Sequence, residues 1–239
     1  MIDTSTDDSI VAAFANGISS QEYSHSRASH SGVIFSHIDA VLSRTGIGVG
    51  GIDLLGVGTG PGSFTGLRIA VSTMRMIAQL TGKPLIGIHS QYLFASALSR
   101  DPSAGVREGD ILISAFDAKK SRVFAGVYRA LHNGIETLLP AGDYYPSEVA
   151  DKVPDGSRVT ACGNGAGLMA DLFSGTDTFF SAVDGFLPGA EGMARAFTRR
   201  YEENPAAFAD YSATLPFYAR KSDAEILHYQ KLQEKIRNA

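Results

Sequence analysis

The residues best suited to chemistry form one glycine-rich run, Gly58-Thr59-Gly60-Pro61-Gly62-Ser63-Phe64-Thr65-Gly66. Closely spaced glycines let a backbone turn tightly and approach another group. A helix that follows such a loop directs its free N–H groups and the positive end of its dipole at the loop. An anion or the backbone of a partner protein would fit there. A turn that only packs a helix against a strand is the simpler alternative.

The known phosphate-binding motifs do not account for this loop. No Gly-x-x-x-x-Gly-Lys occurs, and no lysine lies between residues 58 and 79, so a Walker loop is absent. The spacing of the dinucleotide fingerprint occurs only at Gly46, Gly48 and Gly51, which precede a predicted strand instead of following one. Arg68 is the only cation close to the loop. These three observations weaken the interpretation of the loop as a phosphate-binding site.

Two aspartates, Asp3 and Asp117, resemble the paired carboxylate turns that bracket a nucleotide and a metal between duplicated domains. Phosphoryl transfer needs such carboxylates to hold the metal and activate the acceptor, together with a loop that cradles phosphate. Asp117 is followed by Ala118-Lys119-Lys120 and not by glycines. An active kinase or ATPase that uses both aspartates is therefore an alternative interpretation, and not the favoured one.

An internal repeat relates the two halves of the chain. A constant offset of 114 places Asp3 on Asp117, and it also places Ile10, Val11 and Phe14 on Phe124, Ala125 and Tyr128. A second offset, of 105, places residues 55–62 on residues 160–167, which carry a weaker glycine loop with Gly163 and Gly165. The repeat predicts two copies of a strand–turn–strand unit, each followed by a strand, a glycine loop and a helix. Chance similarity between short segments is the alternative.

Hydrophobic periodicity predicts the elements that position these residues. We expect strands at 10–14, 52–57, 85–88, 111–116 and 123–128, and helices at 32–42, at 65–80, from 92 onward and at 224–237. Asn16-Gly17 predicts a hairpin turn, because both residues accept a positive φ. The stretch 101–105 is rich in Pro, Gly and Ser and is the best linker candidate. We therefore expect an N-terminal domain at 1–102 and a C-terminal domain at 103–239.

Composition excludes several classes of protein. The 239 residues include 21 Lys plus Arg and 25 Asp plus Glu, a net charge of −4, which argues against a basic nucleic-acid module. Any role on nucleic acid is expected to be through a partner. The single cysteine, Cys162, cannot form an intramolecular disulfide, so a reducing compartment, the cytoplasm, is expected. No apolar run approaches the ~18 residues that a membrane span requires, so no membrane association is expected.

Histidines and the lone cysteine are weak candidates for catalysis. His25, His30 and His37 are spaced by five and seven residues, so no two share one helical turn, and a metal site is not expected. Cys162 has no base nearby in sequence, and no Gly-x-Ser-x-Gly elbow occurs. A nucleophilic hydrolase is therefore poorly supported, and Cys162 is interpreted as a buried apolar residue.

The run from Gly58 to Ile69 resembles the signature of the TsaB (YeaZ) family. Weaker matches follow in the same order along the chain: Ile2-Asp3-Thr4-Ser5-Thr6 resembles the family's opening, Phe116-Asp117-Ala118 its second-domain turn, and Pro216-Phe217-Tyr218-Ala219-Arg220 its closing element. The glycine signature is specific to the family. The other matches are weak individually and support the resemblance because they occur in the family's order.

This resemblance implies an α/β architecture: a duplicated actin-like ATPase (ASKHA, ribonuclease H-like) fold with two mixed sheets flanked by helices. It implies a non-catalytic subunit that binds TsaD, with ATP-dependent TsaE assisting, during formation of N6-threonylcarbamoyladenosine at adenosine 37 of tRNA. It further implies no cofactor of its own, ATP and metal on the TsaD and TsaE partners, and a homodimer when alone. Older naming calls the group M22 glycopeptidase-like, but the His-x-x-x-His metal pair of the catalytic relative is missing.

The resemblance also implies which residues matter. Two helices, at about 32–42 and 65–80, are expected to form the docking surface together with the glycine loop. The expected interface residues are Gly58, Gly60, Pro61, Gly62, Ser63, Phe64, Thr65, Gly66, Arg68 and Ile69. The expected remnants of a nucleotide site are Asp3, Thr4, Asp117, Gly163 and Gly165. One departure concerns the first strand, because only Met1 and Ile2 precede Asp3, fewer than the ~5 residues of an ordinary strand.

Overall fold

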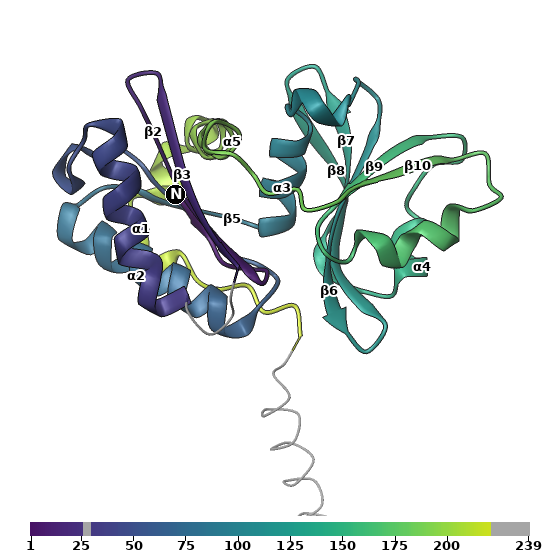
Figure 1. Cartoon of the computed structure of the whole chain (residues 1–239), viewed down its shortest axis with the longest axis horizontal. Coiled ribbons are helices and arrows are strands. Elements are labelled where there is room, and N and C mark those ends of the chain that lie inside the picture. Colours follow the sequence, from purple (N-terminus) through teal and green to yellow (C-terminus); the bar gives the residue numbers. More distant parts are fainter. Residues whose placement is uncertain (26–29, 221–239) are drawn as a thin grey trace, which may run out of the picture.

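The structure is a computed structural model that describes residues 1–25 and 30–220. Two five-stranded sheets lie side by side, each built from five consecutive strands of the chain (Figure 1). The first sheet contains β1 (Ile2–Asp3), β2 (Asp8–Ala15), β3 (Ile18–His25), β4 (Leu55–Gly58) and β5 (Leu85–Ile88). The second contains β6 (Ile111–Lys119), β7 (Arg122–Leu131), β8 (Gly134–Tyr144), β9 (Arg158–Cys162) and β10 (Phe179–Val183).

The two sheets share one topology. The first runs β3-β2-β1-β4-β5 and the second runs β8-β7-β6-β9-β10, and in each order two antiparallel pairings are followed by two parallel pairings. The predicted duplication is therefore confirmed, and the fold is the α/β duplicated actin-like architecture with two mixed sheets flanked by helices. Such mixed sheets need helices on both faces, because the parallel strands are joined by crossovers.

Sheet register corrects the predicted alignment of the two halves. Asp3 pairs with Ile10 in the first sheet, and Phe116 pairs with Phe124 in the second. Ile10 and Phe116 are buried in the core between the sheets and Phe124 packs against it, so Asp3 corresponds to Phe116. The predicted match of Asp3 with Asp117 is thus wrong by one residue, which places the two side chains on opposite faces. The match of Ile10 with Phe124 holds.

The second offset fails for the same reason. An offset of 105 equates Val57 with Cys162. Val57 belongs to the outer core of the first sheet, whereas Cys162 belongs to the core between the sheets. Both loops still follow a strand, but the second continues into a 3-10 helix, η3 (Ala166–Phe173), in place of the expected long α-helix.

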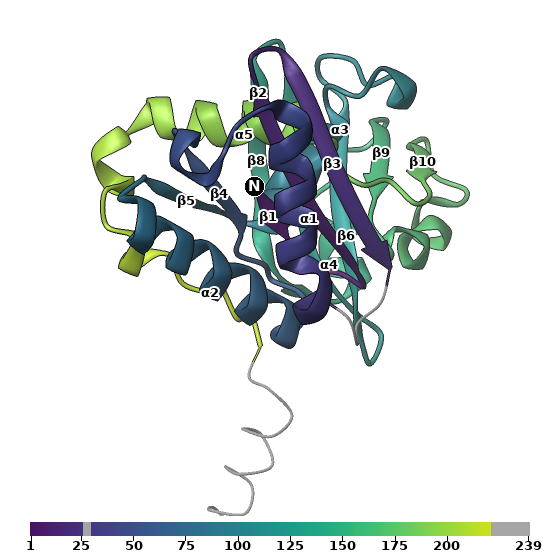
Figure 2. The same cartoon turned by 60° about the vertical axis from the view of Figure 1, so that its left-hand side comes forward.

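Two helices, α1 (His30–Thr45) and α2 (Phe64–Thr81), cover the outer face of the first sheet side by side (Figure 2). Both contain the predicted segments. The buried residues of α2 recur every three or four positions, from Gly66 and Leu67 to Ile77 and Ala78, which gives the helix one apolar stripe. Ser63 caps its start, and Gly82 ends it with a positive φ of 67°. The outer face of the second sheet is covered by α4 (Pro146–Ala150) and η3.

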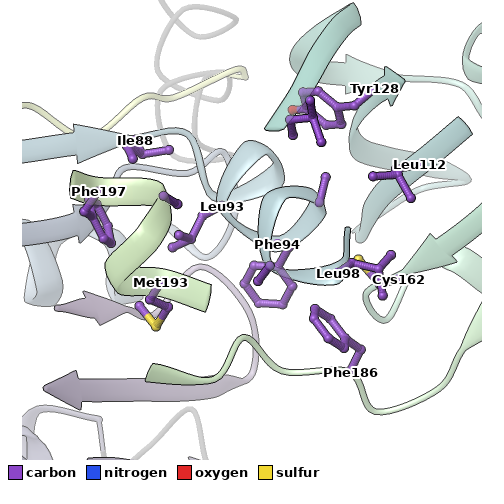
Figure 3. Packing of buried hydrophobic residues seen from close by; sticks show 14 of the residues in the cluster. Ile88, Leu93, Phe94, Leu98, Leu112, Tyr128, Cys162, Phe186, Met193 and Phe197 are labelled. Atoms are coloured by element: carbon purple, nitrogen blue, oxygen red, sulfur yellow. The ribbon is translucent and has the colours of Figure 1, made fainter. Parts of the chain in front are cut away.

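The inner faces of the sheets are joined by α3 (Ser90–Leu98) and α5 (Ala190–Glu203) (Figure 3). Phe94 of α3 meets Phe116 of the second sheet edge to face, with 4.9 Å between ring centroids. Phe197 of α5 lies under Gly56 of the first sheet, where a Cβ would come within 2.6 Å of the ring. The two sheets therefore share one buried core.

Local sequence predicts one of the two hairpin turns but not the other. Asn16 and Gly17 both have positive φ, 53° and 76°, and join β2 to β3 as predicted. The strand β3 itself was not predicted, because its sequence is polar and its exposed side chains carry no apolar alternation. In the second sheet, three consecutive non-glycine residues with positive φ, Lys119, Lys120 and Ser121, make the turn.

The C-terminal part of the described chain returns to the first sheet. Although it follows β10, α5 packs against β2, β3 and β5 as well as α3. The 3-10 helix η5 (Tyr211–Ala213) then contacts α2. The expected boundary at 102 separates the two sets of strands, whereas α5 and η5 lie with the first set. Three further short 3-10 helices are η1 (Val49–Gly51), η2 (Pro102–Ala104) and η4 (Pro205–Phe208).

Two remaining expectations concern the ends of the chain. The helix expected at 224–237 lies outside the described residues. β1 is only two residues long, as expected from the short opening, although it lies at the centre of its sheet between β2 and β4. Across residues 1–25 and 30–220, no helix combines the length and the apolar character needed to span a membrane.

Candidate functional site

The glycine loop connects β4 to α2 and contains a cis peptide bond between Gly60 and Pro61. The backbone N–H of Ser63 donates to the carbonyl of Ser5 at 2.7 Å, and its hydroxyl accepts from Gly66 N at 3.3 Å. The loop is therefore tied to the turn after β1 on one side and to the first turn of α2 on the other. These bonds satisfy some of the backbone N–H groups that have no partner within the helix at its start.

The glycines of the loop are explained by contacts within this chain. A Cβ on Gly58 would lie 1.7 Å from Oδ2 of Asp3, and one on Gly62 would lie 2.1 Å from the carbonyl oxygen of Ser5. A Cβ on Gly66 would lie 2.0 Å from the carbonyl oxygen of Thr4. All three distances are below any real contact, so the loop has no room for side chains at these positions. The packing interpretation thus accounts for the glycine pattern without a bound anion.

Asp3 is a buried structural carboxylate. Its Oδ1 accepts from the N–H and the hydroxyl of Ser5 at 2.9 and 2.6 Å, and its Oδ2 accepts from the Ser90 hydroxyl at 2.6 Å. Burial raises the pKa of Asp3 above its ordinary value, although the hydrogen bonds from Ser5 and Ser90 act in the opposite sense. The same Ser90 hydroxyl accepts from Gly60 N at 3.0 Å. Asp3 and Ser90 therefore hold the glycine loop against β1.

Thr4 joins this network from the same turn. Its hydroxyl donates to the carbonyl of Gly66 at 2.6 Å, and the side chain is fully buried. Together with the close approach of the Thr4 carbonyl to Gly66, this bond fixes the start of α2 over β1. Thr4 therefore positions the loop and is closed to a ligand from outside.

The corresponding part of the second sheet is built differently. Asp117 receives bonds from the backbone N–H and the ammonium of Lys119, at 2.8 and 2.5 Å to its two oxygens. Its own N–H donates to Oδ1 of Asn164 at 2.9 Å. Gly163 and Gly165 lie against the β6 backbone, where a Cβ would come within 2.3 and 2.8 Å of it. These two glycines allow strand packing.

A cleft of about 380 Å³ separates the two turns. Its walls come from the start of α2 and the turn after β1 on one side, and from the ends of β6 and β9 on the other. It is lined by Ser5, Thr6, Asp7, Gly62, Ser63, Phe64, Thr65, Gly66, Phe116, Asp117, Ala118, Lys119, Phe124 and Asn164. Asp117 therefore reaches the cleft, whereas Asp3, Thr4, Gly163 and Gly165 do not line it. The predicted remnants are near one another in the fold, but only one of them faces the cleft.

The closing element packs over the glycine loop. Phe217 N donates to the Thr59 carbonyl at 2.8 Å, and its ring stacks on His89 with 4.7 Å between centroids. The ring of Tyr218 lies 4.5 Å from that of Phe64. Arg220 donates to the Ala118 carbonyl at 2.9 Å, so this element also bridges to the second sheet.

Arg68 has a defined place in this arrangement. Its guanidinium carbon lies 3.9 Å from the centre of the Phe64 ring, and its Nε donates to the Tyr218 hydroxyl at 3.1 Å. A guanidinium over an aromatic face gains electrostatic energy from the ring quadrupole. Arg68 thus holds the closing element against α2. The cation that lies close to the loop in sequence is therefore used in a contact within the chain.

Three residues that organise the site were missed from the sequence. Ser90 and Gln91 start α3, and Asn164 lies between the two glycines of the second loop. The fully buried Gln91 donates to the Pro61 carbonyl at 2.9 Å and to the Phe124 carbonyl at 3.3 Å, so one side chain joins both halves. The sequence signal that could have identified Ser90 and Gln91 is a polar Ser-Gln pair at the start of an otherwise apolar helix.

The outer surface of α1 and α2 carries exposed apolar side chains. Phe35 of α1 is 51% exposed, and Met76 and Leu80 of α2 are 43% and 79% exposed. Met76 and Leu80 are four residues apart and so share a helix face. Ile69, which was predicted as an interface residue, packs partly against the outer core instead.

The histidines and Cys162 take structural or surface positions. His25 makes a 2.7 Å bond with Asp8, which raises its pKa, and its side chain is 82% exposed. The side chain of His30 lies outside the described residues. Cys162 is fully buried in the core between the sheets, and burial raises its pKa to about 12. Its interpretation as a buried apolar residue is confirmed.

Comparison with known proteins gives one family match. Residues 14–197 match the model of the family "TsaD: tRNA N6-adenosine threonylcarbamoyltransferase". The tRNA threonylcarbamoyladenosine biosynthesis protein TsaB of Escherichia coli K12 is 26% identical over 231 residues, covering 93% of this chain and 94% of the relative. The protein of the same name from Haemophilus influenzae is 28% identical over 123 residues, 52% of this chain and 50% of the relative.

A solved structure agrees in fold. YeaZ from Pseudomonas aeruginosa superposes with a TM-score of 0.76 at 23% identity, covering 91% of this chain and 97% of that one. Similarity at this identity speaks for the overall fold alone.

Proposed function

Because this chain belongs to the TsaB (YeaZ) family, within the TsaD-type family, we propose that it serves tRNA threonylcarbamoyladenosine biosynthesis as a non-catalytic subunit that binds TsaD. TsaD, assisted by ATP-dependent TsaE, then modifies adenosine 37 of tRNA. The chain contributes binding energy and shape, works in the cytoplasm, and contacts tRNA only through its partners.

The observation that carries this proposal is the state of the two aspartates. The oxygens of Asp3 accept three hydrogen bonds from Ser5 and Ser90 inside the protein, and Asp3 does not line the cleft. Asp117 lines the cleft, but Lys119 bonds to both of its oxygens. Phosphoryl transfer requires carboxylates that face the metal and the acceptor together. The geometry thus favours a binding role over the alternative of an active kinase or ATPase.

The docking surface that we propose is the outer face of α1 and α2 next to the glycine loop. Phe35, Met76 and Leu80 are large apolar side chains that the isolated chain leaves in water. Apolar and aromatic side chains at the centre of an interface usually provide most of its binding energy. The loop itself fixes the angle of α2 through Ser63 and Gly66, and so shapes this face without direct contact. Alone, the same face would pair two copies of this chain.

Size-exclusion chromatography with purified TsaD tests the docking surface. The wild-type chain should co-elute with TsaD at micromolar concentration, and the double variant Met76→Asp/Leu80→Asp should not. Leu168→Asp is the matched control, because Leu168 is 49% exposed on η3, over the second sheet. Loss of co-elution in the control, or its absence in the wild type, would contradict the proposal. Gly62 is unsuitable for this test, since a side chain there would collide with the Ser5 carbonyl.

Reconstituted tRNA modification tests the non-catalytic role. With TsaD and TsaE present, Asp117→Asn should leave the rate of threonylcarbamoyladenosine formation unchanged, because Asp117 has no reacting group to serve. The double variant at Met76 and Leu80 should reduce that rate. A large loss with Asp117→Asn, together with ATP binding by the isolated wild-type chain, would favour the kinase or ATPase alternative.

A further inference from the structure

One edge of the second sheet is formed by β10, on the side of the molecule away from α1 and α2 (Figure 1). Phe179 N donates to the Ser157 carbonyl at 3.0 Å, and β10 pairs with β9 along its whole length. Because successive residues of a strand direct their backbone groups to alternate sides, Phe180 and Ala182 direct theirs away from β9. Within residues 1–25 and 30–220, these outward groups make no hydrogen bond.

The other comparable edges of the molecule are covered or protected. In the first sheet, β5 takes the place of β10, and the Thr214 hydroxyl donates to the Leu85 carbonyl there at 3.3 Å. At the opposite edge of the second sheet, β8 contains Glu136, Pro140 and Asp143. Charged residues and proline are the types that protect an edge from pairing with another strand. β10 contains neither, so its edge is open and unprotected.

Apolar side chains flank the open edge on both faces of the sheet. Phe179 is 59% exposed, and it shares its face with Val183, which packs against the core between the sheets. On the other face, Phe180 stacks on Phe173 of η3 with 5.1 Å between ring centroids. η3 packs against β10 and leaves Leu172 40% exposed. A strand added to this edge would extend both faces, so apolar side chains would fit at successive positions.

The sequence around β10 is acidic. Residues 159–194 contain no lysine or arginine but four acidic residues: Asp171, Asp177, Asp184 and Glu191. Asp177 and Asp184 are exposed, and they lie just before and just after the strand. Arg158, which precedes this stretch, lies over the Phe179 ring and forms an ion pair with Asp110 at 3.4 Å. The two ends of the open edge therefore favour a cationic partner.

This charge decides between the possible occupants. Antiparallel pairing with β10 of a second copy, centred on Ser181, would use the outward backbone groups of both strands. It would also place Asp184 of one copy opposite Thr178 of the other, next to Asp177, so like charges would meet at both ends. Nucleic acid, which is negatively charged, would be repelled as well. The favoured occupant is an extended protein segment with a lysine or arginine at each end of an apolar stretch.

We propose that the open edge of β10 binds an extended basic segment of a partner protein as an added strand. Main-chain hydrogen bonds to Phe180 and Ala182 would provide affinity, and Asp177 and Asp184 would attract the two cationic ends. This inference is independent of the proposed function, because the edge lies on the other side of the molecule from α1 and α2.

Fluorescence anisotropy with synthetic peptides tests the proposal on the full chain. The probe is the octapeptide Lys-Thr-Val-Ile-Val-Thr-Val-Lys, with fluorescein at its N-terminus and an amide at its C-terminus. It should bind saturably, and more weakly as the salt concentration rises. The same peptide with glutamate in place of both lysines should bind about ten-fold more weakly. A peptide with Pro-Pro in place of Ile-Val should not bind, because two adjacent prolines remove a ladder donor in either alignment.

Substitutions at β10 provide the matched variants. Ala182→Pro removes an outward N–H at an exposed position and should abolish binding, whereas Ala182→Val keeps the N–H and should retain it. The double variant Asp177→Lys/Asp184→Lys should bind the glutamate peptide in preference to the lysine peptide. Both aspartates are exposed, so this charge reversal should leave the fold intact and remains decisive if Ala182→Pro fails to fold.

Four results would overturn the proposal. The lysine peptide does not bind the wild type, it binds folded Ala182→Pro as tightly as the wild type, or the charge reversal leaves the preference between the peptides unchanged. The fourth comes from sedimentation velocity, which tests for pairing with a second copy. A wild-type dimer that Ala182→Pro dissociates, and that Met76→Asp/Leu80→Asp preserves, would assign the edge to self-association.

Discussion

The Ser90 hydroxyl donates a 2.6 Å hydrogen bond to Oδ2 of Asp3 across 87 residues of sequence. Through this bond the start of α3 is tied to the first strand, and the same hydroxyl holds the glycine loop by accepting from Gly60. A carboxylate at a position suited to phosphoryl chemistry is thus used for assembly. Its burial and its partners lead to the first prediction.

Replacing Asp3 by Asn should change how stability depends on pH. Burial raises the pKa of Asp3 above its ordinary value of 3.8, so between 3.8 and the raised value the native state binds more protons than the unfolded state. The free energy of unfolding contributed by Asp3 is therefore present at low pH and is lost as pH rises, by at most about 1.4 kcal/mol per pH unit. Asp3→Asn removes this contribution. Urea unfolding of both proteins from pH 4 to 8 should give a difference, variant minus wild type, that increases with pH; a flat difference would contradict the prediction.

Met1 should produce a pH dependence of opposite sign. Burial lowers the pKa of the N-terminal amine from 8.0 to about 5, so between these values the unfolded state binds more protons. Stability from this group is present above pH 8 and is lost as pH falls toward 5, by up to about 1.4 kcal/mol per pH unit. Acetylation of Met1 abolishes the titration. Acetylated protein should therefore lose this rise between pH 5 and 8 in chemical unfolding, and equal slopes with and without the acetyl group would refute the argument.

Gly58→Ala should strongly destabilise the fold. Its Cβ would lie 1.7 Å from Oδ2 of the buried Asp3, where nothing can shift without breaking the bond from Ser90. We expect a loss of about 3 kcal/mol or more, at the upper end of single substitutions. Gly50→Ala is the control, because a Cβ there meets nothing within 4 Å. Thermal unfolding should separate the two variants by many degrees, and similar Tm values would show that the loop yields more easily than its contacts imply.

Gln91→Ala should loosen the connection between the two halves. The side chain donates to carbonyls of Pro61 and Phe124, one in each half, from a fully buried position. Its removal leaves two carbonyls without these donors and a cavity, for a loss of about 2–4 kcal/mol. Hydrogen exchange should show the greatest loss of protection at the start of α3 and along β7. Unchanged protection at β7 would mean that Gln91 does not couple the two sheets.

Tyr218→Ala should release the closing element from the glycine loop. Tyr218 packs on Phe64 and accepts from Arg68, whose guanidinium lies over the Phe64 ring. Exposed contacts of this kind contribute only about 0.5–1 kcal/mol each, so the global Tm should change little. Limited proteolysis should instead become faster within residues 214–220. Arg68→Lys should give a similar but smaller increase, because lysine lacks the planar group that stacks.

Local signals in the sequence were sufficient for most elements up to β7, whereas β8, β10, α4 and α5 were not predicted. The positive φ of Asn16 and Gly17, the apolar stripe of α2 and its Gly82 stop each depend on a few neighbouring residues. The duplication also followed from sequence, because both halves repeat the same order of strands and turns. β3 was missed, since a polar edge strand carries no apolar alternation.

The candidate site was only partly predictable. The glycine run was found at its correct place, but the reason for Gly58, Gly62 and Gly66 is a contact with Asp3, Ser5 or Thr4, more than fifty residues away. The return of α5 to the first sheet had no local signal either, because its apolar face fits any apolar partner.

Sequence alone therefore predicted the family, most elements of the first half and the glycine loop, because these depend on residue type and on spacing along the chain. The match of Asp3 to Phe116 and the bond from Ser90 arose only in the folded molecule. Their common physical reason is that side chains alternate faces along a strand, so a shift of one residue reverses what faces the cleft and what is buried. That shift is set by pairing between distant strands, which no local pattern encodes.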